Sequence, residues 1–337
     1  MALSIVLMFL TPTAGVRGEY KPDHYEYPKL TSRALGMGGA TVAWIDDSSA
    51  IFHNPAGLGR LNSVMLSHAH SRNHFPGQIE NLDQLDSDPT SLIIPLNGLF
   101  LGLPVGSAGV GWVLQGEFGY DYRVRNDESI PQERLWGVGP EDRNECVGFK
   151  LWPGGYFGFG HRVSELLFSE KNDLPNDTTW RRTGESFPLG FQQVIIPGVQ
   201  YGITFEDAEY DYQPHRLSPE GEKIQGDRIT TSRSGWCIRP TGWLTLARDV
   251  ENVRLQLWPS KEKSKSQRVF WGAEIKLEPF FSFRWGSFDG HPTRGWSYEI
   301  GPWRSDSAWV DGFMPGMVDN YSSDFKDYHA TGFNLNF

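Results

Sequence analysis

The sequence predicts an all-β fold, a transmembrane antiparallel β-barrel of about 14 strands that holds a short N-terminal plug with helical turns. Three observations support this fold class. Aromatic residues make up 14% of the 337 residues, although hydrophobic residues reach only 39% and the mean hydropathy is −0.43. Segments that alternate between apolar and polar residues recur along the chain, and long polar stretches separate them. The last six residues form one more such segment, which ends on Phe337.

The composition favours a barrel over a soluble domain. A water-soluble domain with 13 Trp, 12 Tyr and 21 Phe would normally show a stronger aliphatic core. A barrel wall accommodates this mixture, because lipid-facing and lumen-facing residues alternate and aromatic belts mark both bilayer interfaces. The net charge of −10 disfavours a nucleic-acid partner, which would require a basic stripe. Outer-membrane lipid is therefore the expected surrounding.

The N-terminus predicts export. Residues 2–10 are mainly apolar, but they are too few to span a bilayer as a helix, which takes about 20 residues. Small residues follow, so residues 1–18 are expected to be a signal peptide, although the usual basic start is missing. A buried N-terminal strand or helix is the alternative. Residues 19–62 are then expected to form the plug, and residues 63–337 the barrel.

The run between residues 35 and 61 predicts a compact plug rather than a catalytic loop. Its glycines allow tight turns and positive φ. Asp46 and Asp47 are candidate helix caps, and Asn54 before Pro55 is typical of a cap followed by proline at the first helical position. The predicted plug motif consists of Gly36, Gly38, Gly39, Asp46, Asp47, Asn54, Pro55, Ala56 and Gly57.

This run also resembles the N-terminal segment of FadL-like and PorV-like outer-membrane barrels. The matching positions are residues 33–40, 46–50 and 54–58. The FadL resemblance implies passive transport of hydrophobic small molecules, such as long-chain fatty acids, across the outer membrane of a Gram-negative-type bacterium. The PorV resemblance implies a different class, a non-enzymatic scaffold that handles secreted protein cargo. An internal apolar path through the barrel wall would favour transport, and a plugged, polar lumen with a large loop-side groove would favour the scaffold.

The C-terminal segment has one apolar and one polar face. Period-two alternation puts Phe333, Leu335 and Phe337 on one side and Asn334 and Asn336 on the other. Such a strand suits a wall between lipid and lumen. The segment also resembles the signal that the outer-membrane barrel assembly machinery reads, with Ala330 as a small departure. The residues of this predicted signal are Gly332, Phe333, Leu335 and Phe337.

The last quarter of the chain shows the strand pattern most clearly. In residues 269–277 the outward set would be apolar, while Glu274 and Lys276 fall in the intervening set. Phe281, Phe283 and Trp285 alternate with Ser282, Arg284 and Gly286 in the next segment. Charged residues at intervening positions require a polar lumen.

Two turns are predicted between strands in the middle of the chain. One lies at residues 153–155, where Pro153 is followed by two glycines. The other lies at residues 249–252, between a strand over residues 236–247 and one over residues 253–258. The second prediction rests on the polar character of that tetrapeptide.

The sequence contains no pattern that predicts an enzyme, so no catalytic residue, metal or cofactor is expected. The glycines at 36–39 lack the apolar strand that a dinucleotide fingerprint needs before it. His68, His70 and His74 are interpreted as polar strand residues rather than metal ligands. Cys146 and Cys237 have no metal-type spacing and are expected to be packed singly.

Overall fold

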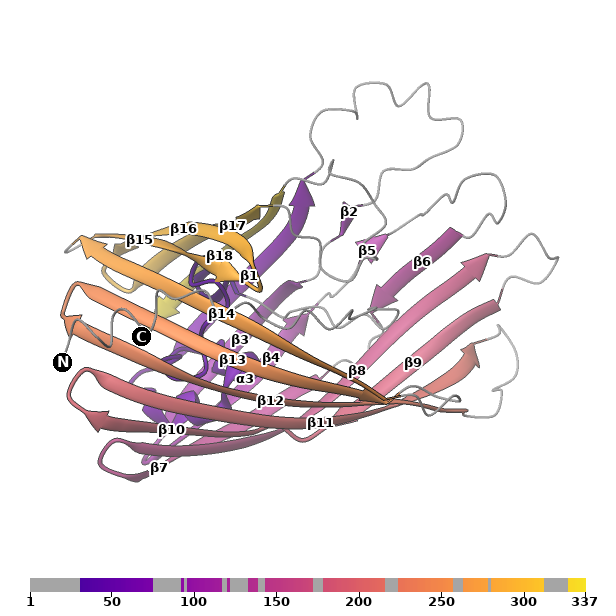
Figure 1. Ribbon diagram of the computed structural model, residues 1–337, viewed down its shortest axis with the longest axis horizontal. Coiled ribbons are helices and arrows are strands. Elements are labelled where there is room, and N and C mark those ends of the chain that lie inside the picture. The colour runs from indigo at the N-terminus through magenta and orange to yellow at the C-terminus, as the bar shows by residue number, and fades with distance from the viewer. Residues whose placement is uncertain are drawn as a thin grey trace, which may run out of the picture.

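The computed structural model is a closed barrel of antiparallel strands (Figure 1). It describes residues 31–74, 92–93, 96–116, 120–121, 133–138, 143–171, 178–215, 224–256, 263–277, 280–311 and 327–337. The predicted signal peptide, residues 1–18, and the first part of the predicted plug lie outside the described residues.

The described elements are three short helices followed by strands. The helices are α2 (Ser32–Gly36), α3 (Ala50–His53) and the 3₁₀ helix η1 (Pro55–Arg60). The strands are β1 (Met65–His74), β2 (Leu92–Ile93), β3 (Leu96–Val105), β4 (Ala108–Gly116), β5 (Tyr120–Asp121), β6 (Glu133–Val138), β7 (Arg143–Trp152), β8 (Gly155–Lys171), β9 (Thr178–Ser186), β10 (Leu189–Ile196), β11 (Val199–His215), β12 (Ile224–Thr241), β13 (Leu244–Gln256), β14 (Lys263–Leu277), β15 (Phe281–Phe288), β16 (His291–Ile300), β17 (Trp303–Asp311) and β18 (Asp327–Asn336).

The 18 strand segments form one sheet that closes on itself. β1 pairs with β18 on one side and with β3 on the other, so the ladder has no free edge at this seam. Four pairs of segments, β2/β3, β4/β5, β6/β7 and β9/β10, are each two parts of one strand, which gives the 14 strands of the barrel. The predicted fold class is confirmed. Among the described residues, no helix is long and apolar enough to cross a membrane.

One end of the barrel carries only short turns. The turn before β8 uses Gly154 with a φ of 81°, and the turn before β11 uses Gly198 with a φ of 80°. Positive φ suits glycine, because it has no Cβ to clash with the backbone. The predicted turn at residues 153–155 is confirmed.

The turn predicted at residues 249–252 is wrong. β13 runs without interruption from Leu244 to Gln256, and the turn lies earlier, at Gly242 and Trp243. The physical reason is that acidic side chains of β13 face the polar lumen, where arginines of the neighbouring strands pair with them. Asp249 and Glu251 point inward, where Arg233 of β12 lies within 2.8 Å of Asp249 and Arg268 of β14 lies 2.7 Å from Glu251. Polar residues here belong to the inner face of a strand rather than to a turn.

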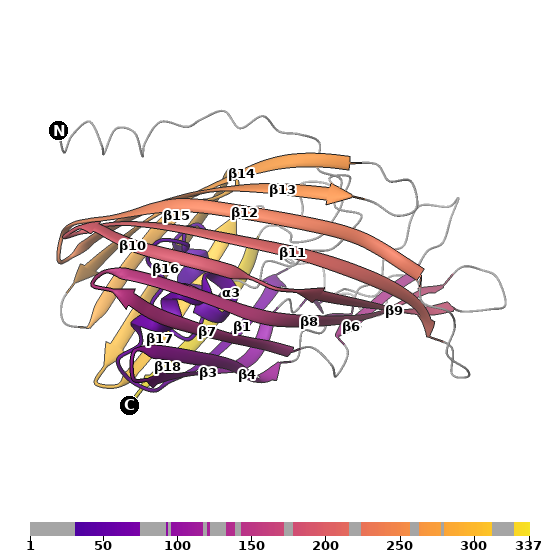
Figure 2. The same cartoon turned by 90° about the horizontal axis from the view of Figure 1, so that it is seen from below.

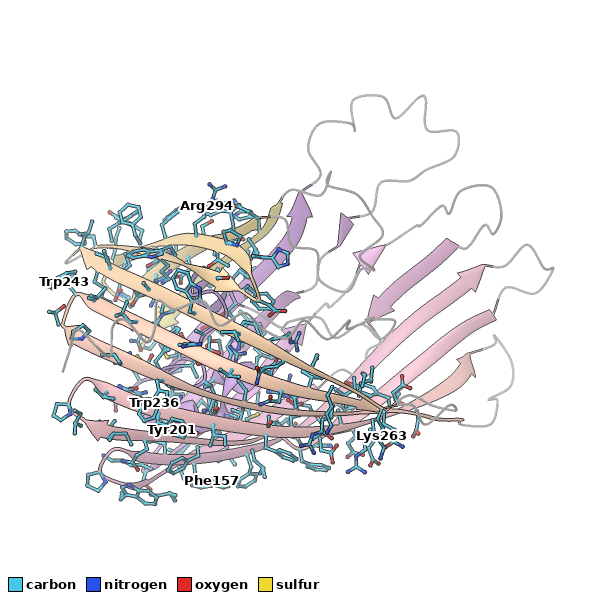
Figure 3. All side chains as sticks on the ribbon, viewed as in Figure 1. Phe157, Tyr201, Trp236, Trp243, Lys263 and Arg294 are labelled. Atoms are coloured by element: carbon cyan, nitrogen blue, oxygen red, sulfur yellow. The ribbon has the colours of Figure 1, made fainter. Side chains whose placement is uncertain are left out.

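The outer face of the barrel is apolar around the short-turn end. In β15, Phe283 and Trp285 are exposed, whereas Ser282, Arg284 and Gly286 between them are buried, as predicted. Figure 3 shows labelled outer-face side chains of β8, β11, β12 and the turn after β12. Exposed large apolar residues on this surface are Val105, Leu151, Trp152, Phe159, Phe187, Leu189, Ile195, Ile196, Ile203, Phe205, Trp236, Trp243, Leu277, Phe280, Phe283, Trp285, Trp296, Tyr298, Ile300, Trp303 and Phe337.

The interior contains the N-terminal part of the described chain. Residues 31–62, called the inner segment below, lie inside the ring of strands, and Figure 2 shows α3 surrounded by them. Most of this segment is buried, including the large side chains Leu35, Met37, Trp44 and Ile51. The main core of the molecule is therefore the contact between the inner segment and the barrel wall.

Candidate functional site

The inner segment lies directly on glycines of the wall. A Cβ on Gly202 of β11 would overlap the Val42 carbonyl oxygen, and one on Gly272 of β14 would overlap that of Met37. Side chains at these positions would push the segment away, so the missing Cβ atoms allow backbone-to-backbone contact. The strand glycines whose Cβ would meet the inner segment this closely, called the glycine bed, are Gly109, Gly148, Gly158, Gly190, Gly202 and Gly272.

A buried network of charges joins the inner segment to β14, β15 and β17. Arg284 donates to Glu274 at 2.6 Å and to Asp306 at 3.0 Å. Arg33 of α2 lies 3.8 Å from the same Glu274 oxygen and 3.2 Å from Asp47 of its own segment. These side chains are at most 11% exposed. Charges removed from water this far are tolerated only when they are paired.

The other acidic residue of the predicted motif, Asp46, is held from two sides. Arg33 lies 3.5 Å from one carboxylate oxygen and Arg60 lies 3.6 Å from the other. Although burial opposes the effect, Arg60 and Arg33 lower the pKa of Asp46 below its usual value, so the carboxylate stays charged. Arg60 also donates to Gln200 of β11 at 2.9 Å. Asp46 therefore connects the two ends of the inner segment.

A second charged pair holds the middle of the segment. Asp249 of β13 accepts the backbone N–H groups of Thr41 at 2.7 Å and Val42 at 3.0 Å. Arg233 of β12 donates to the same carboxylate oxygen at 2.9 Å and to the Gly39 carbonyl. The inner segment is thus fixed by its backbone as well as by its side chains.

Asn54 combines the expected capping role with contacts to the wall. Its Oδ1 accepts the N–H of Ala56 at 3.1 Å, as predicted for a cap ahead of Pro55. Its Nδ2 donates to the Val42 carbonyl at 2.7 Å and to the Phe191 carbonyl of β10 at 3.3 Å. One side chain therefore begins η1, ties it to the middle of the segment and joins it to β10.

A break in the wall lies between β4 and β7. Among the described residues, β4 pairs with β7 only from Ala108 to Trp112, although β4 continues to Gly116 and β7 starts at Arg143. At the same point the pairing of β4 with β3 shifts register, with Leu114 as the extra residue. A bulge bends its strand and interrupts pairing, which explains why the two strands separate here.

Aromatic and polar side chains close the inner side of this break. Phe100 of β3 faces Val113 across the ladder, and its ring makes an edge-to-face contact with Phe52 of α3 at 4.8 Å between centroids. Asn144 of β7 is 3% exposed, and its Oδ1 has no hydrogen-bond partner among the described residues. Arg162 of β8, the ladder partner of Asn144, donates to the Ile51 and Phe52 carbonyls at 2.6 and 2.9 Å.

A cleft continues from Phe100 along the seam between β1 and β18. It is small and polar, with a cavity volume of about 10 Å³, which is room for about one water molecule. Ser67 and Asn334 lie near the short-turn ends of their strands, so the cleft extends toward that end of the barrel. Six residues that line the cleft are Arg33, Ser49, Ser67, Phe100, Asp306 and Asn334.

The structure brings most of the predicted plug motif together inside the barrel. Gly38 and Gly39 adopt positive φ of 60° and 77°, and Gly36 is the last residue of α2. Pro55, Ala56 and Gly57 form the start of η1, and Asp47 accepts from the Ser49 N–H at 3.0 Å.

The predicted assembly signal forms the end of β18. Asn334 points inward and donates to Asp306 at 3.2 Å, while Phe333 stacks on Trp303 and Phe337 is 70% exposed. This matches the predicted two-faced strand. Gly332 and Leu335 belong to the same strand, and recognition of these residues by the assembly machinery stays a prediction.

Sequence reasoning identified the inner segment but missed most of its wall partners. Alternation predicts Arg284 and Glu274 on the inner face, whereas Asp249 was assigned to a turn and no role was predicted for Asp306 and Arg162. For Asp306 and Arg162 the available signal was parity within the strand, because each lies on the face opposite to an exposed aromatic residue, Trp303 and Phe159. β13 contains no aromatic residue, so Asp249 had no such signal. In the described part of the chain, no group of three or more His, Cys, Asp or Glu side chains could hold a metal. Cys146 and Cys237 are both buried free thiols, as expected.

Comparisons with solved structures place this architecture among known barrels. The toluene transporter TbuX from Ralstonia pickettii superimposes with a TM-score of 0.60 at 12% identity, over 93% of this chain and 99% of that chain. The fold is that of a FadL-like barrel. The Pseudomonas putida toluene transporter TodX gives a TM-score of 0.59 at 11% identity, with the same shares covered. A FadL homologue from Pseudomonas aeruginosa gives 0.54 at 11% identity, over 93% and 99% of the two chains. No protein-family model and no curated protein sequence matches the chain.

Proposed function

We propose that this protein passively transports small hydrophobic molecules across the outer membrane of a Gram-negative-type bacterium. The observation that carries the proposal is the break between β4 and β7, because it is an interruption of the wall that leads to apolar side chains. The apolar outer face supports a position in lipid. Structural neighbours described as toluene transporters and monoaromatic hydrocarbon channels support the class of solute.

The inner segment acts as the plug in this proposal. It fills the lumen with buried charges and backbone contacts, so a hydrophobic molecule has no apolar route along the barrel axis. A route through the wall break leads to the apolar side chains at Phe100. Beyond Phe100 the cleft beside β1 and β18 is lined by Arg33 and Asp306 of the charge network, so passage there requires the inner segment to shift. The molecule passes Phe100 when the Phe52–Phe100 ring pair opens.

One observation favours a second function. The lumen is both plugged and polar, which fits a PorV-like scaffold that grips secreted protein cargo and conducts nothing. A scaffold needs neither the wall break nor the cleft. The two functions therefore differ in whether the purified protein accelerates the passage of small molecules.

Uptake by vesicles tests the proposal. Purified protein is placed in vesicles whose outer leaflet is lipopolysaccharide, and uptake of labelled toluene and of a labelled long-chain fatty acid is compared with protein-free vesicles. Transport predicts faster uptake of at least one compound. Equal rates for both compounds, with the protein folded and inserted, would reject transport and favour the scaffold.

A further inference from the structure

The inner side of the wall break contains two buried polar atoms with no partner. These are Oδ1 of Asn144 and Nε of Arg162, and neither has a hydrogen-bond partner among the described residues. The two residues face each other in the ladder between β7 and β8. An unpaired buried polar atom costs about 1–3 kcal/mol, so a site with an unpaired acceptor and an unpaired donor on two ladder partners is suited to a group that satisfies both.

The surroundings of these atoms are aromatic and aliphatic. If the ladder between β4 and β7 continued by one residue, Asn144 would pair with Val113. On the other side of β4, Val113 pairs with Phe100 of β3. Phe52 contacts the ring of Phe100, and Arg162 binds the carbonyl of Phe52. A molecule at this point would meet rings on one side and the two polar atoms on the other.

Charge at the site favours a neutral polar group over a carboxylate. Glu206 already pairs with Arg162 at 2.6 Å, and its second oxygen accepts from Ser186 at 2.6 Å. Two other Arg162 hydrogen bonds go to the carbonyls of Ile51 and Phe52. The guanidinium is therefore neutralised, and an incoming carboxylate would be repelled by Glu206 without a free cation to compensate.

The geometry points to a transit subsite for an aromatic molecule that carries one hydroxyl group, with Asn144 and Arg162 at its polar end and Phe52 and Phe100 as its aromatic wall. A hydroxyl both donates and accepts, so it matches the Asn144 amide whichever way that amide is turned, while also accepting from Nε of Arg162. This inference rests on the proposed function and adds the substrate class that the wall break selects.

The test compares 4-methylphenol with toluene, which differ only by the hydroxyl group. Dissociation constants for the purified protein and uptake into the lipopolysaccharide vesicles are measured for both compounds. The subsite predicts that the natural protein prefers 4-methylphenol and that Asn144→Leu, which keeps the branching of the side chain and removes the amide, reduces this preference about tenfold. The control Thr231→Val removes a hydroxyl from β12 and leaves the preference unchanged.

Two failures are distinguishable. If both compounds are taken up with the same preference in the natural protein and in Asn144→Leu, the subsite is rejected and transport stands. If 4-methylphenol binds with the expected preference but neither compound is taken up, transport is rejected and the subsite stands. Should Asn144→Leu fail to fold, a crystal of the natural protein soaked with 4-iodophenol gives the answer. Anomalous scattering from iodine between Phe100 and Asn144 supports the subsite, and its absence overturns it.

Discussion

Single charged residues decide how firmly the inner segment is attached. Arg284 has no exposed side-chain surface and binds Glu274, Asp306 and Ser297 with three donors. Its removal would leave both carboxylates buried with fewer partners, and Glu274 also lies beside Arg33 of the inner segment. The contact between the segment and the wall therefore depends on a residue that belongs to the wall.

Replacement of Arg284 by methionine is expected to destabilise the folded protein by about 3–5 kcal/mol, because it leaves buried charge uncompensated. Urea unfolding of the barrel in detergent measures this difference. The control is Arg294→Met, which removes an exposed arginine 3.5 Å from Asp311 and should cost less than about 1 kcal/mol. Equal losses in the two variants would show that the network contributes nothing specific.

The attachment of α3 is expected to weaken in acid. Burial, together with the positive charges of Arg233 and Arg162, lowers the pKa of His53 from 6.5 to about 3. Its Nε2 is also buried without a partner among the described residues. Between about pH 3 and pH 6.5, His53 binds a proton when the segment is detached but not when it is attached. The free energy of attachment therefore becomes less favourable as the pH falls below about 6.5, and His53 does not change it above that pH.

Hydrogen exchange at the amides of residues 50–53, corrected for the intrinsic effect of pH, measures the attachment at pH 5 and pH 7.5. Protection should decrease at pH 5 in the natural protein. In His53→Asn the difference between the two pH values should largely disappear. A pH effect of the same size in that variant would assign it to another group.

At the scale of elements, contacts with several strands of the wall hold the inner segment in place. The glycine bed supports its backbone, Asp249 holds its middle and Asn54 fixes the start of η1. The capping contact of Asn54 was predicted, because a cap acts locally. Asp46 and Asp47 were also predicted as caps, but α3 begins after Ser49 without a side-chain cap and Asp46 pairs with arginines instead. The sequence did not predict the contacts that the wall makes with this segment. Asp249 and Thr41, for example, are 208 residues apart in the chain, so no local pattern indicates their hydrogen bond. The same cause explains the misplaced turn, where an inward-facing acidic stretch resembled a loop.

A removable bond between the inner segment and β1 tests whether the segment must move. Ser48 and Ser67 share a hydrogen bond, so cysteines at both positions are close enough to form a disulfide. In a background with Cys146 and Cys237 replaced by alanine, the oxidised protein should take up solute more slowly, and a reducing agent should restore the rate. Unchanged uptake after oxidation would mean that the segment stays fixed during transport.

Replacement of Asn54 and Pro55 by alanine is expected to change solute flux and to leave the heat-resistant folded barrel intact. The reason is that Asn54 contacts the segment and β10, whereas the strand ladders close without it. Gel mobility with and without heating reports the fold, and vesicle uptake reports the flux. Loss of the folded band would make the motif purely structural.

At the scale of the whole molecule, the alternation of apolar and polar residues predicted a closed wall with one face toward lipid and one toward a polar lumen. β15 shows this alternation residue by residue, and in β18 Asn334 points inward while Phe337 is 70% exposed. The wall break could not be predicted, because it arises where Leu114 adds one residue to β4 and shifts its register against β3. A single extra residue in an aromatic- and glycine-rich strand has no distinct sequence pattern. The proposed route for solute is thus a property of the assembled sheet.

Closure of the wall break tests the central claim most directly. Cysteines at positions 113 and 144, in the background without natural cysteines, are joined by a short bismaleimide crosslinker, and toluene uptake is measured before and after joining. The account predicts uptake above the protein-free rate before joining and a return to that rate afterwards. Uptake that continues unchanged with the two strands joined would contradict passage through the wall.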